Sequence, residues 1–451
     1  MAKDQEVMAQ FNPKIFKAYD IRGTFPDQVN EKVAFWVGQA YAQLTGAKRV
    51  VVGRDMRLSS EGLFYHLVKG LTSQGVMVDD IGLVPVDMVY FARGFYKYDG
   101  GIMVTASHNP KEYNGFKMVR EDGSVVKGQD LKEFTVDTSR QSAVGKVDQK
   151  EVYPEFLKHI FSFVDLSTIK PFKIVVDAGN GMAGKIIPKI AQRLPGHIIP
   201  LNFELDGNFP AHPSNPLLPE SRSQITEAVV REQADFGLIF DGDTDRLFLV
   251  DEKGQFIPAD MTLILLAEYF LKKNPGAGIV YNAVCSKAVA EKVKEWGGQA
   301  YRCRVGYAFV RDKMIEHDCP LGGELSAHYA FKGNYFSDSG MISMLIGCQI
   351  ISEENKPLSE LIQGFTTYYK ADEHNLPVEE SAKTIEAIKR EYNDGQIDEL
   401  DGVTITYPDW WFNVRPSNTE PLLRVTAEAD TKEIFDKNFN KLVDLVESLN
   451  K

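Results

Sequence analysis

Short apolar segments alternating with amphipathic ones are the feature that most constrains the fold of this chain. Arg49–Gly53, Val76–Ile81 and Gly101–Ala106 each have the pattern of a buried strand, and Ser60–Gln74 has the pattern of a helix. Strands and helices that alternate in this way build a parallel or mixed sheet covered by helices. The first part of the chain is therefore predicted to be an α/β domain.

The same alternation begins again twice further along the chain, and a long helix is expected from about Ser339. The strands predicted for these two units are Phe172–Asp177, Asp235–Phe240, Leu247–Asp251, Gly278–Asn282 and Gln299–Cys303, and the helices of the last unit are Ser286–Trp296 and Tyr307–His317. A chain of 451 residues also exceeds the roughly 250–300 residues over which a single core grows. We therefore expect three similar α/β units.

The last part of the chain has a different character. Lys370–Pro377 resembles a linker, and a helix, three strands and a final amphipathic helix are expected beyond it. The three strands are Val403–Tyr407, Trp411–Val414 and Leu422–Ala427. This order predicts a smaller C-terminal α+β domain.

Composition excludes several classes of protein. A net charge of −12 argues against a nucleic-acid partner or a basic membrane-surface protein. The sequence has no run of about 18 apolar residues, and its first residues lack the apolar core of a signal peptide. Four cysteines without a CxxC pair are too few for a disulfide framework and predict free buried thiols. We expect a cytoplasmic enzyme.

The segment TASHNP, Thr105–Pro110, follows a buried strand, where α/β proteins commonly bind ligands. Asn109 before Pro110 favours a turn that exposes Ser107. His108 is adjacent to this serine, and Lys117 follows shortly after. The alternative is an ordinary strand-to-helix turn, and the absence of G-x-S-x-G disfavours an α/β-hydrolase.

Three aspartates alternate in DGDTDR, at positions 241, 243 and 245. In an extended backbone their carboxylates would lie on one face, where they would repel one another without a cation. Dense carboxylate oxygens predict Mg²⁺, and Arg246 could neutralise a phosphate. The alternatives are a solvated turn and an EF-hand with Glu252 at its twelfth place, although Arg246 stands where an EF-hand needs glycine.

Gly179–Gly184 matches G-x-G-x-x-G after a strand, with Glu204 and Asp206 at roughly the spacing of a dinucleotide site. An NAD-dependent dehydrogenase is therefore an alternative from another class. We favour a glycine-rich turn, because no other motif suits hydride transfer.

Two further loops carry polar groups suited to a phosphosugar. Gly322–His328 offers Glu324, Ser326 and His328 to sugar hydroxyls, and a packed structural loop is the alternative. In Arg415–Pro421, a guanidinium fork and several donors suit phosphate, and a polar structural turn is the alternative. The donors of this second loop are Arg415, Ser417, Asn418 and Thr419.

Taken in order, TASHNP, DGDTDR, GGELSAH and RPSNTEP resemble the α-D-phosphohexomutase family over nearly the whole chain. KAYDIRG (Lys17–Gly23), VGRDMRLSS (Val52–Ser60) and AGNGMAG (Ala178–Gly184) also match. The resemblance implies an α/β fold of three similar mixed-sheet domains and a smaller C-terminal α+β domain around a central cleft. The implied domains are a phosphoserine domain (1–150), a metal-binding domain (151–256), a sugar-recognition domain (257–370) and a phosphate-binding domain (371–451).

The resemblance also implies a role for each loop. Ser107 would be the phosphorylated serine, and its phosphate would hold Mg²⁺ together with the three aspartates. The reacting end would be lined by Tyr19, Arg22, His108, Lys117 and Arg246, with His108 or Lys117 as the base; the sugar would be read by Glu324, Ser326 and His328, and the distant phosphate held by Arg415, Ser417, Asn418 and Thr419.

The implied reaction interconverts hexose 1- and 6-phosphates through a hexose 1,6-bisphosphate, which also serves as activator. GELSAH and RPSNTEP look most like the bacterial phosphomannomutases of the family. Members that also take glucose phosphates commonly have His at the position of Tyr307 and Lys at that of Val284. Activity on glucose phosphates is therefore not predicted either way. Phosphoglucomutase, phosphoglucosamine mutase, a phosphatase and a non-catalytic phosphosugar-binding protein are the alternatives, and the oligomeric state is not predicted.

Overall fold

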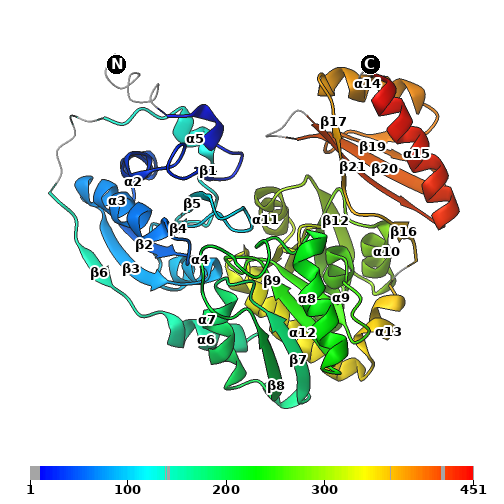
Figure 1. The fold of residues 1–451 in the computed structure, drawn as a ribbon, viewed down its shortest axis with the longest axis horizontal. Helices are drawn as coiled ribbons and strands as arrows, with labels where there is room; N and C mark the ends of the chain where they lie inside the picture. Colours follow the sequence, from blue (N-terminus) through cyan, green and yellow to red (C-terminus); the bar gives the residue numbers. More distant parts are fainter. Residues whose placement is uncertain (1–10, 138, 140–142, 366, 418–421, 450–451) are drawn as a thin grey trace. The chain divides into compact units, whose positions relative to one another are not determined.

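The structure is a computed structural model, and it describes residues 11–449 except 138, 140–142, 366 and 418–421 (Figure 1). The chain forms two compact units. Unit 1 contains residues 1–258 and 327–359, and unit 2 contains residues 259–326 and 360–451.

The first sheet of unit 1 is mixed. Its strands have the order β1-β5-β4-β2-β3-β6. Strands β4, β2, β3 and β6 are parallel to one another, β5 is antiparallel to β4, and β1 is antiparallel to β5. Helices α2 and α3 pack on each other, and α4 packs on β2 and β4. The bounds are β1 (Ile21–Thr24), α2 (Glu31–Thr45), β2 (Arg49–Arg54), α3 (Ser60–Ser73), β3 (Met77–Leu83), α4 (Val86–Phe95), β4 (Gly100–Val104), β5 (Tyr113–Arg120), α5 (Gly128–Lys132) and β6 (Val147–Gln149).

The second sheet of unit 1 has the order β10-β9-β7-β8, in which only β10 is antiparallel to its neighbour. A hairpin of β14 and β15 and the buried helix α12 complete the unit. The bounds are α6 (Tyr153–Phe161), β7 (Phe172–Asp177), α7 (Ala183–Ala191), β8 (Gly196–Leu201), α8 (Pro219–Arg231), β9 (Phe236–Phe240), β10 (Leu247–Asp251), β14 (Tyr329–Phe331), β15 (Ser337–Asp338) and α12 (Gly340–Glu354).

Unit 2 begins with a parallel arrangement in which β11 lies between β12 and β13. It continues into an antiparallel sheet of β16 to β21, whose apolar side chains pack with α14 and α15 in a separate core. The bounds are α9 (Ala259–Lys273), β11 (Gly278–Asn282), α10 (Lys287–Glu295), β12 (Gln299–Cys303), α11 (Tyr307–Glu316), β13 (Leu321–Gly323), α13 (Leu358–Gln363), β16 (Tyr369–Lys370), β17 (His374–Pro377), α14 (Ser381–Glu391), β18 (Gln396–Asp398), β19 (Val403–Thr406), β20 (Trp410–Pro416), β21 (Leu422–Ala429) and α15 (Lys432–Leu449).

Four strands, β7, β10, β11 and β12, have the predicted bounds. The predicted linker Lys370–Pro377 is wrong, because it contains part of β16 and all of β17, and both strands pair antiparallel with β21. Their charged, non-alternating sequence hides the backbone pairing that makes them strands.

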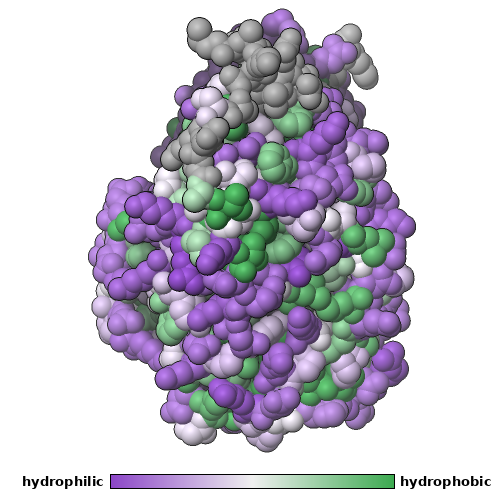
Figure 2. All heavy atoms as spheres, turned by 90° about the vertical axis from the view of Figure 1, so that its left-hand side faces the viewer, coloured by the Kyte–Doolittle hydropathy of each residue, from purple (hydrophilic) through white to green (hydrophobic). Residues whose placement is uncertain are grey.

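The predicted state of the cysteines is confirmed, since all four are free and buried. Within the described part of the chain, no helix combines the length and the apolar character that crossing a membrane requires. Hydrophilic side chains cover most of the face in Figure 2, with hydrophobic ones in small groups between them.

Candidate active site

The three aspartates lie in the loop that joins β9 to β10 in unit 1. Their carboxylate oxygens are within 4.8 Å of one another, and all three residues are buried. The predicted extended backbone is wrong, because the loop turns at Thr244, whose φ is +70°. The carboxylates therefore converge through a reversal of the chain and not through the alternation of a strand.

This cluster has the chemistry of a cation site. Burial, together with the charges of Asp245 and Asp243, raises the pKa of Asp241 well above its usual range. Among the described residues, the Oδ1 atom of Asp243 is buried without a hydrogen-bond partner. Since hard divalent cations prefer carboxylate oxygens, the donor set fits such an ion.

Ser107 lies in the turn after β4, directly against the aspartate loop. Its Oγ atom donates a 2.7 Å hydrogen bond to Oδ2 of Asp241 and lies 3.3 Å from Nδ1 of His108. The predicted exposure of Ser107 is wrong, because the residue is only 1% exposed. A Cβ atom on Gly242 would lie 2.7 Å from the Ser107 carbonyl oxygen, so the close contact of the two loops depends on this glycine.

Lys117 lies on β5, beside β4, and reaches the aspartates from that sheet. Its Nζ atom is 2.8 Å from Oδ2 of Asp243 and 2.5 Å from Oδ2 of Asp245. Burial opposes the charged form, but the two carboxylates outweigh it and raise the pKa of Lys117 above its usual range. Lys117 is therefore an ammonium ion that partly neutralises the cluster.

His108 and Arg22 also belong to this site. Burial, and after it the positive charge of Arg246, lowers the pKa of His108 well below its usual range, so its imidazole is neutral near pH 7. Arg22 on β1 donates a 2.6 Å hydrogen bond to Oδ1 of Asn109 and pairs with Asp20. Tyr19, the remaining predicted residue of this end, is partly buried in the segment that leads into β1.

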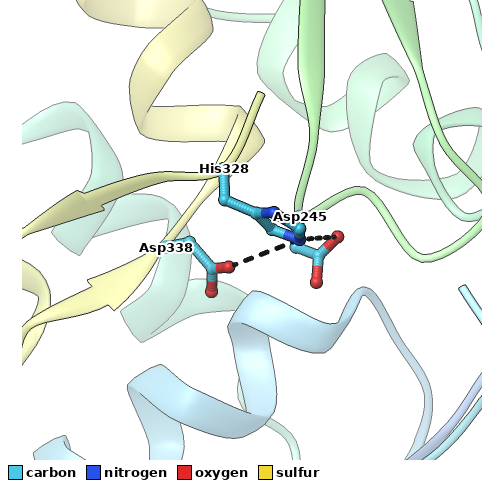
Figure 3. Close-up of side chains that lie close together, drawn as sticks. All are labelled: Asp245, His328 and Asp338. Carbon is cyan, nitrogen blue, oxygen red and sulfur yellow. Dashed lines mark ion pairs between the residues drawn. The ribbon is translucent and has the colours of Figure 1, made fainter. Parts of the chain in front are cut away.

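The structure brings His328 to the aspartates, although its predicted role was in sugar recognition. Figure 3 shows its ring between Asp245 and Asp338. The Nε2 atom lies 3.5 Å from Oδ1 of Asp245 and 4.0 Å from Oδ2 of Asp338. Arg246 pairs with His328 through an isolated β-bridge, and its Nε atom lies 3.3 Å from the same ring nitrogen. Sequence reasoning missed Asp338, for which the only signal is its place just before the start of α12.

The glycine-rich turn after β7 packs against the loop that carries the three aspartates. The N–H of Met182 donates a 2.9 Å hydrogen bond to the carbonyl oxygen of Gly242. A Cβ atom on Gly181 would lie only 2.8 Å from that oxygen. This packing explains the G-x-G-x-x-G spacing without a dinucleotide.

The EF-hand alternative is wrong, because its twelfth residue serves a different purpose. Glu252 accepts hydrogen bonds from the N–H and the hydroxyl of Ser359, and the N–H bond is 3.1 Å long. The side chain is thus bound to Ser359 within unit 1 and is not a ligand of the aspartate site.

The rest of the predicted loop Gly322–His328, up to Ser326, lies in unit 2, and so does the loop that begins at Arg415. The Oε1 atom of Glu324 accepts hydrogen bonds of 2.8 Å from Gly306 N and 3.2 Å from Asn282 Nδ2. Ser326 follows in a partly buried turn. Glu324 is therefore held in a fixed orientation by the backbone and an amide.

Arg415 lies at the end of β20, directly opposite Arg424 of β21. Glu373 forms ion pairs with both arginines. The N–H of Ser417 donates a 2.9 Å hydrogen bond to Leu422 O, which closes the base of the hairpin. Sequence reasoning missed Glu373 and Arg424, because their meeting depends on strand register. Asn418 and Thr419, which were also predicted to bind phosphate, lie outside the described residues.

Comparisons with known proteins place these loops in a family. Four models match in order: phosphoglucomutase/phosphomannomutase α/β/α domain I (residues 13–141), domain II (151–254), domain III (258–369) and the C-terminal domain (373–445). A phosphomannomutase of Escherichia coli K12 is 38% identical, covering 92% of this chain and 94% of its own. A phosphomannomutase/phosphoglucomutase of Pseudomonas aeruginosa is 37% identical, covering 94% of this chain and 93% of its own.

A solved structure agrees with these relatives. The phosphoglucomutase/phosphomannomutase family protein of Burkholderia thailandensis has a TM-score of 0.88 and 33% identity, covering 97% of this chain and 98% of its own. The chain therefore belongs to the phosphoglucomutase/phosphomannomutase family, metal-dependent isomerases of carbohydrate metabolism with mixed α/β sheets in three domains and a further C-terminal domain.

Proposed function

We propose that this protein interconverts mannose 1-phosphate and mannose 6-phosphate through a phosphorylated Ser107. The observation that carries the proposal is the 2.7 Å hydrogen bond from Ser107 Oγ to Asp241, which places a hydroxyl nucleophile beside a buried cluster of acidic residues. The similarity to relatives named phosphomannomutase supports mannose as the sugar. Glucose phosphates are further candidates, because other relatives are named phosphomannomutase/phosphoglucomutase.

In the proposed reaction, the phosphoryl group of phospho-Ser107 passes to the free hydroxyl of a hexose monophosphate. The bond from phosphorus to Ser107 Oγ breaks as the bond to the sugar oxygen forms, and the hydroxyl proton goes to a base. The resulting hexose 1,6-bisphosphate reorients, and Ser107 accepts its other phosphoryl group. The same bisphosphate, added in trace, serves as the activator.

We assign Mg²⁺ to Asp241, Asp243, Asp245 and the Ser107 phosphate. When bound, such an ion supplies a Lewis acid that offsets charge on the transferred group. Arg246 and Lys117 add positive charge at the same place. The two predicted bases both lie at this site: Lys117 Nζ is 2.8 Å from Asp243 Oδ2, and His108 Nδ1 is 3.3 Å from Ser107 Oγ.

The remaining residues are assigned to substrate binding. Tyr19 and Arg22 would line the reacting end, and Glu324, Ser326 and His328 would contact sugar hydroxyls. Arg415, Ser417, Asn418 and Thr419 would hold the phosphate that does not react, and this phosphate would share Arg415 with Glu373. We keep the four domains 1–150, 151–256, 257–370 and 371–451 as the phosphoserine, metal, sugar and phosphate domains, and we assign the protein to the cytoplasm.

The test is ³¹P NMR of mannose 1-phosphate with Mg²⁺ and a trace of hexose 1,6-bisphosphate, with glucose and glucosamine 1-phosphates in parallel. Conversion to mannose 6-phosphate that stops on addition of EDTA and returns with Mg²⁺ is expected, and Ser107→Ala should lose it. Turnover of glucosamine phosphate alone would contradict the assigned sugar. Inorganic phosphate without isomerisation would indicate a phosphatase, and no reaction by Ser107-phosphorylated protein would indicate a binding protein.

A further inference from the structure

Arg57 is a buried residue that binds the backbone of the serine loop, residues 105–113. It follows β2, and its side chain is 0% exposed. One terminal nitrogen, Nη2, donates hydrogen bonds of 2.7 Å to the carbonyl oxygen of Ser107 and 2.6 Å to that of Asn109. The other, Nη1, donates to the carbonyl oxygens of Pro110 at 2.8 Å and Tyr113 at 3.0 Å. One side chain thus binds four carbonyls within seven residues.

The guanidinium also forms an ion pair with Asp55. The Nε atom of Arg57 lies 3.3 Å from Oδ2 of Asp55, and both side chains are fully enclosed. The other oxygen of Asp55 accepts hydrogen bonds from the N–H of Arg57 at 3.1 Å and from the hydroxyl of Ser60 at 2.5 Å. Because a planar guanidinium presents its donors in a rigid fork, the four carbonyls must meet it in one geometry.

The serine loop has a conformation that requires such support. Ser107 has a φ of +50°, a left-handed backbone that costs free energy for a residue with a side chain. The loop also turns several carbonyl groups toward the interior, where each needs a donor. Arg57 supplies donors on both sides of His108, at Ser107 and at Asn109.

We propose that Arg57 is a positioning residue for the reaction: by binding the carbonyls of the serine loop, it holds the Ser107 hydroxyl against Asp241. This inference rests on the proposed function of Ser107. In that role Arg57 contacts neither the sugar nor the phosphate, and it acts through the backbone of Ser107. A rigid nucleophile matters because a misplacement of about 1 Å at a reacting atom can cost on the order of a hundredfold in rate.

The test compares Arg57→Lys with Arg54→Lys. Lysine at position 57 keeps a positive charge opposite Asp55 but lacks the planar fork that spans four carbonyls. Arg54 lies three residues earlier and forms ion pairs with Glu61 and Asp80. Arg54→Lys is therefore the same substitution at a side chain whose ion pairs lie outside the serine loop.

For Arg57→Lys we expect kcat to fall roughly ten- to a hundredfold while KM stays within about threefold, since the change affects an oriented nucleophile and not ground-state binding. Hydrogen exchange should rise in the peptide covering residues 105–113, and Arg54→Lys should match the wild type in both measurements. Thermal unfolding measures the folded fraction of each variant, and intact mass measures the fraction that is phosphorylated. Each kcat is corrected for both fractions.

An unchanged corrected kcat, a loss confined to KM, or equal exchange in the two variants would overturn the role of Arg57. If Arg57→Lys does not fold, Asp55→Asn provides the second variant, because it releases the guanidinium while leaving Arg57 in place. Failure of the wild-type protein to accept a phosphoryl group on Ser107 from hexose 1,6-bisphosphate would instead overturn the proposed function.

Discussion

The Nζ atom of Lys117 lies 2.8 Å from the Oδ2 atom of Asp243, inside the cluster that we assign to Mg²⁺. An ammonium ion and a divalent cation compete for the same carboxylates. Lys117→Met should therefore lower the melting temperature in EDTA, because removing one partner of a buried ion pair costs about 3–5 kcal/mol. Added Mg²⁺ should raise it more in this variant than in the wild type.

Differential scanning calorimetry with and without Mg²⁺ measures both effects. Lys132→Met, on the exposed side of α5, is the matched control and should behave as the wild type. An equal Mg²⁺ shift in Lys117→Met and wild type would contradict the competition.

Gly181→Ala should weaken the binding of Mg²⁺ by roughly tenfold, since overpacking costs about 1–3 kcal/mol and would push the aspartate loop away. The added Cβ atom would lie 2.8 Å from Gly242 O. Isothermal titration with Mg²⁺ measures the change. Gly62→Ala in α3 is the control, because its Cβ atom would meet nothing within 4 Å. Unaltered affinity in Gly181→Ala would show that the turn does not support the loop.

Asp87→Asn should stabilise the protein increasingly as the pH rises. Burial raises the pKa of Asp87 to about 7, although Ser339 donates a 2.7 Å hydrogen bond to it. An unfolded aspartate has a pKa of about 3.9, so the wild type loses stability between about pH 4 and pH 7, by up to about 1.4 kcal/mol per pH unit. Asparagine keeps an acceptor for Ser339 and cannot ionise.

Urea unfolding at several pH values in EDTA tests this expectation. The stability difference between Asp87→Asn and wild type should grow up to about pH 7 and then stay constant. The exposed variant Asp27→Asn should follow the wild type. A difference that does not change with pH would mean that Asp87 is not the titrating group.

Arg415→Ala should raise KM roughly ten- to a hundredfold and affect kcat less, because a charged hydrogen bond is worth about 1.5–3 kcal/mol. Steady-state kinetics with mannose 1-phosphate measures both constants. Arg390→Ala, at the exposed end of α14, is the control. A KM equal to that of the control would remove Arg415 from phosphate binding.

Much of the fold was accessible from local patterns. Strands β7 and β10 were predicted with their observed bounds, because a strand buried on both faces is a continuous apolar run between polar turns. β17 was missed because an edge strand pairs through its backbone, which leaves little trace in its side chains. The residue types in DGDTDR indicated a cation site, but the wrong backbone conformation was predicted for this segment.

The sequence by itself determined the types of groups in each loop and the order of the helices and strands, since both are local properties of the chain. Only the tertiary structure decided that His328 lies beside Asp245, that Ser107 is buried, and that Arg57 binds the serine loop. The physical reason is that such contacts join segments tens of residues apart. Their geometry depends on the packing of whole sheets and on strand register, and local periodicity in the sequence carries no information about either.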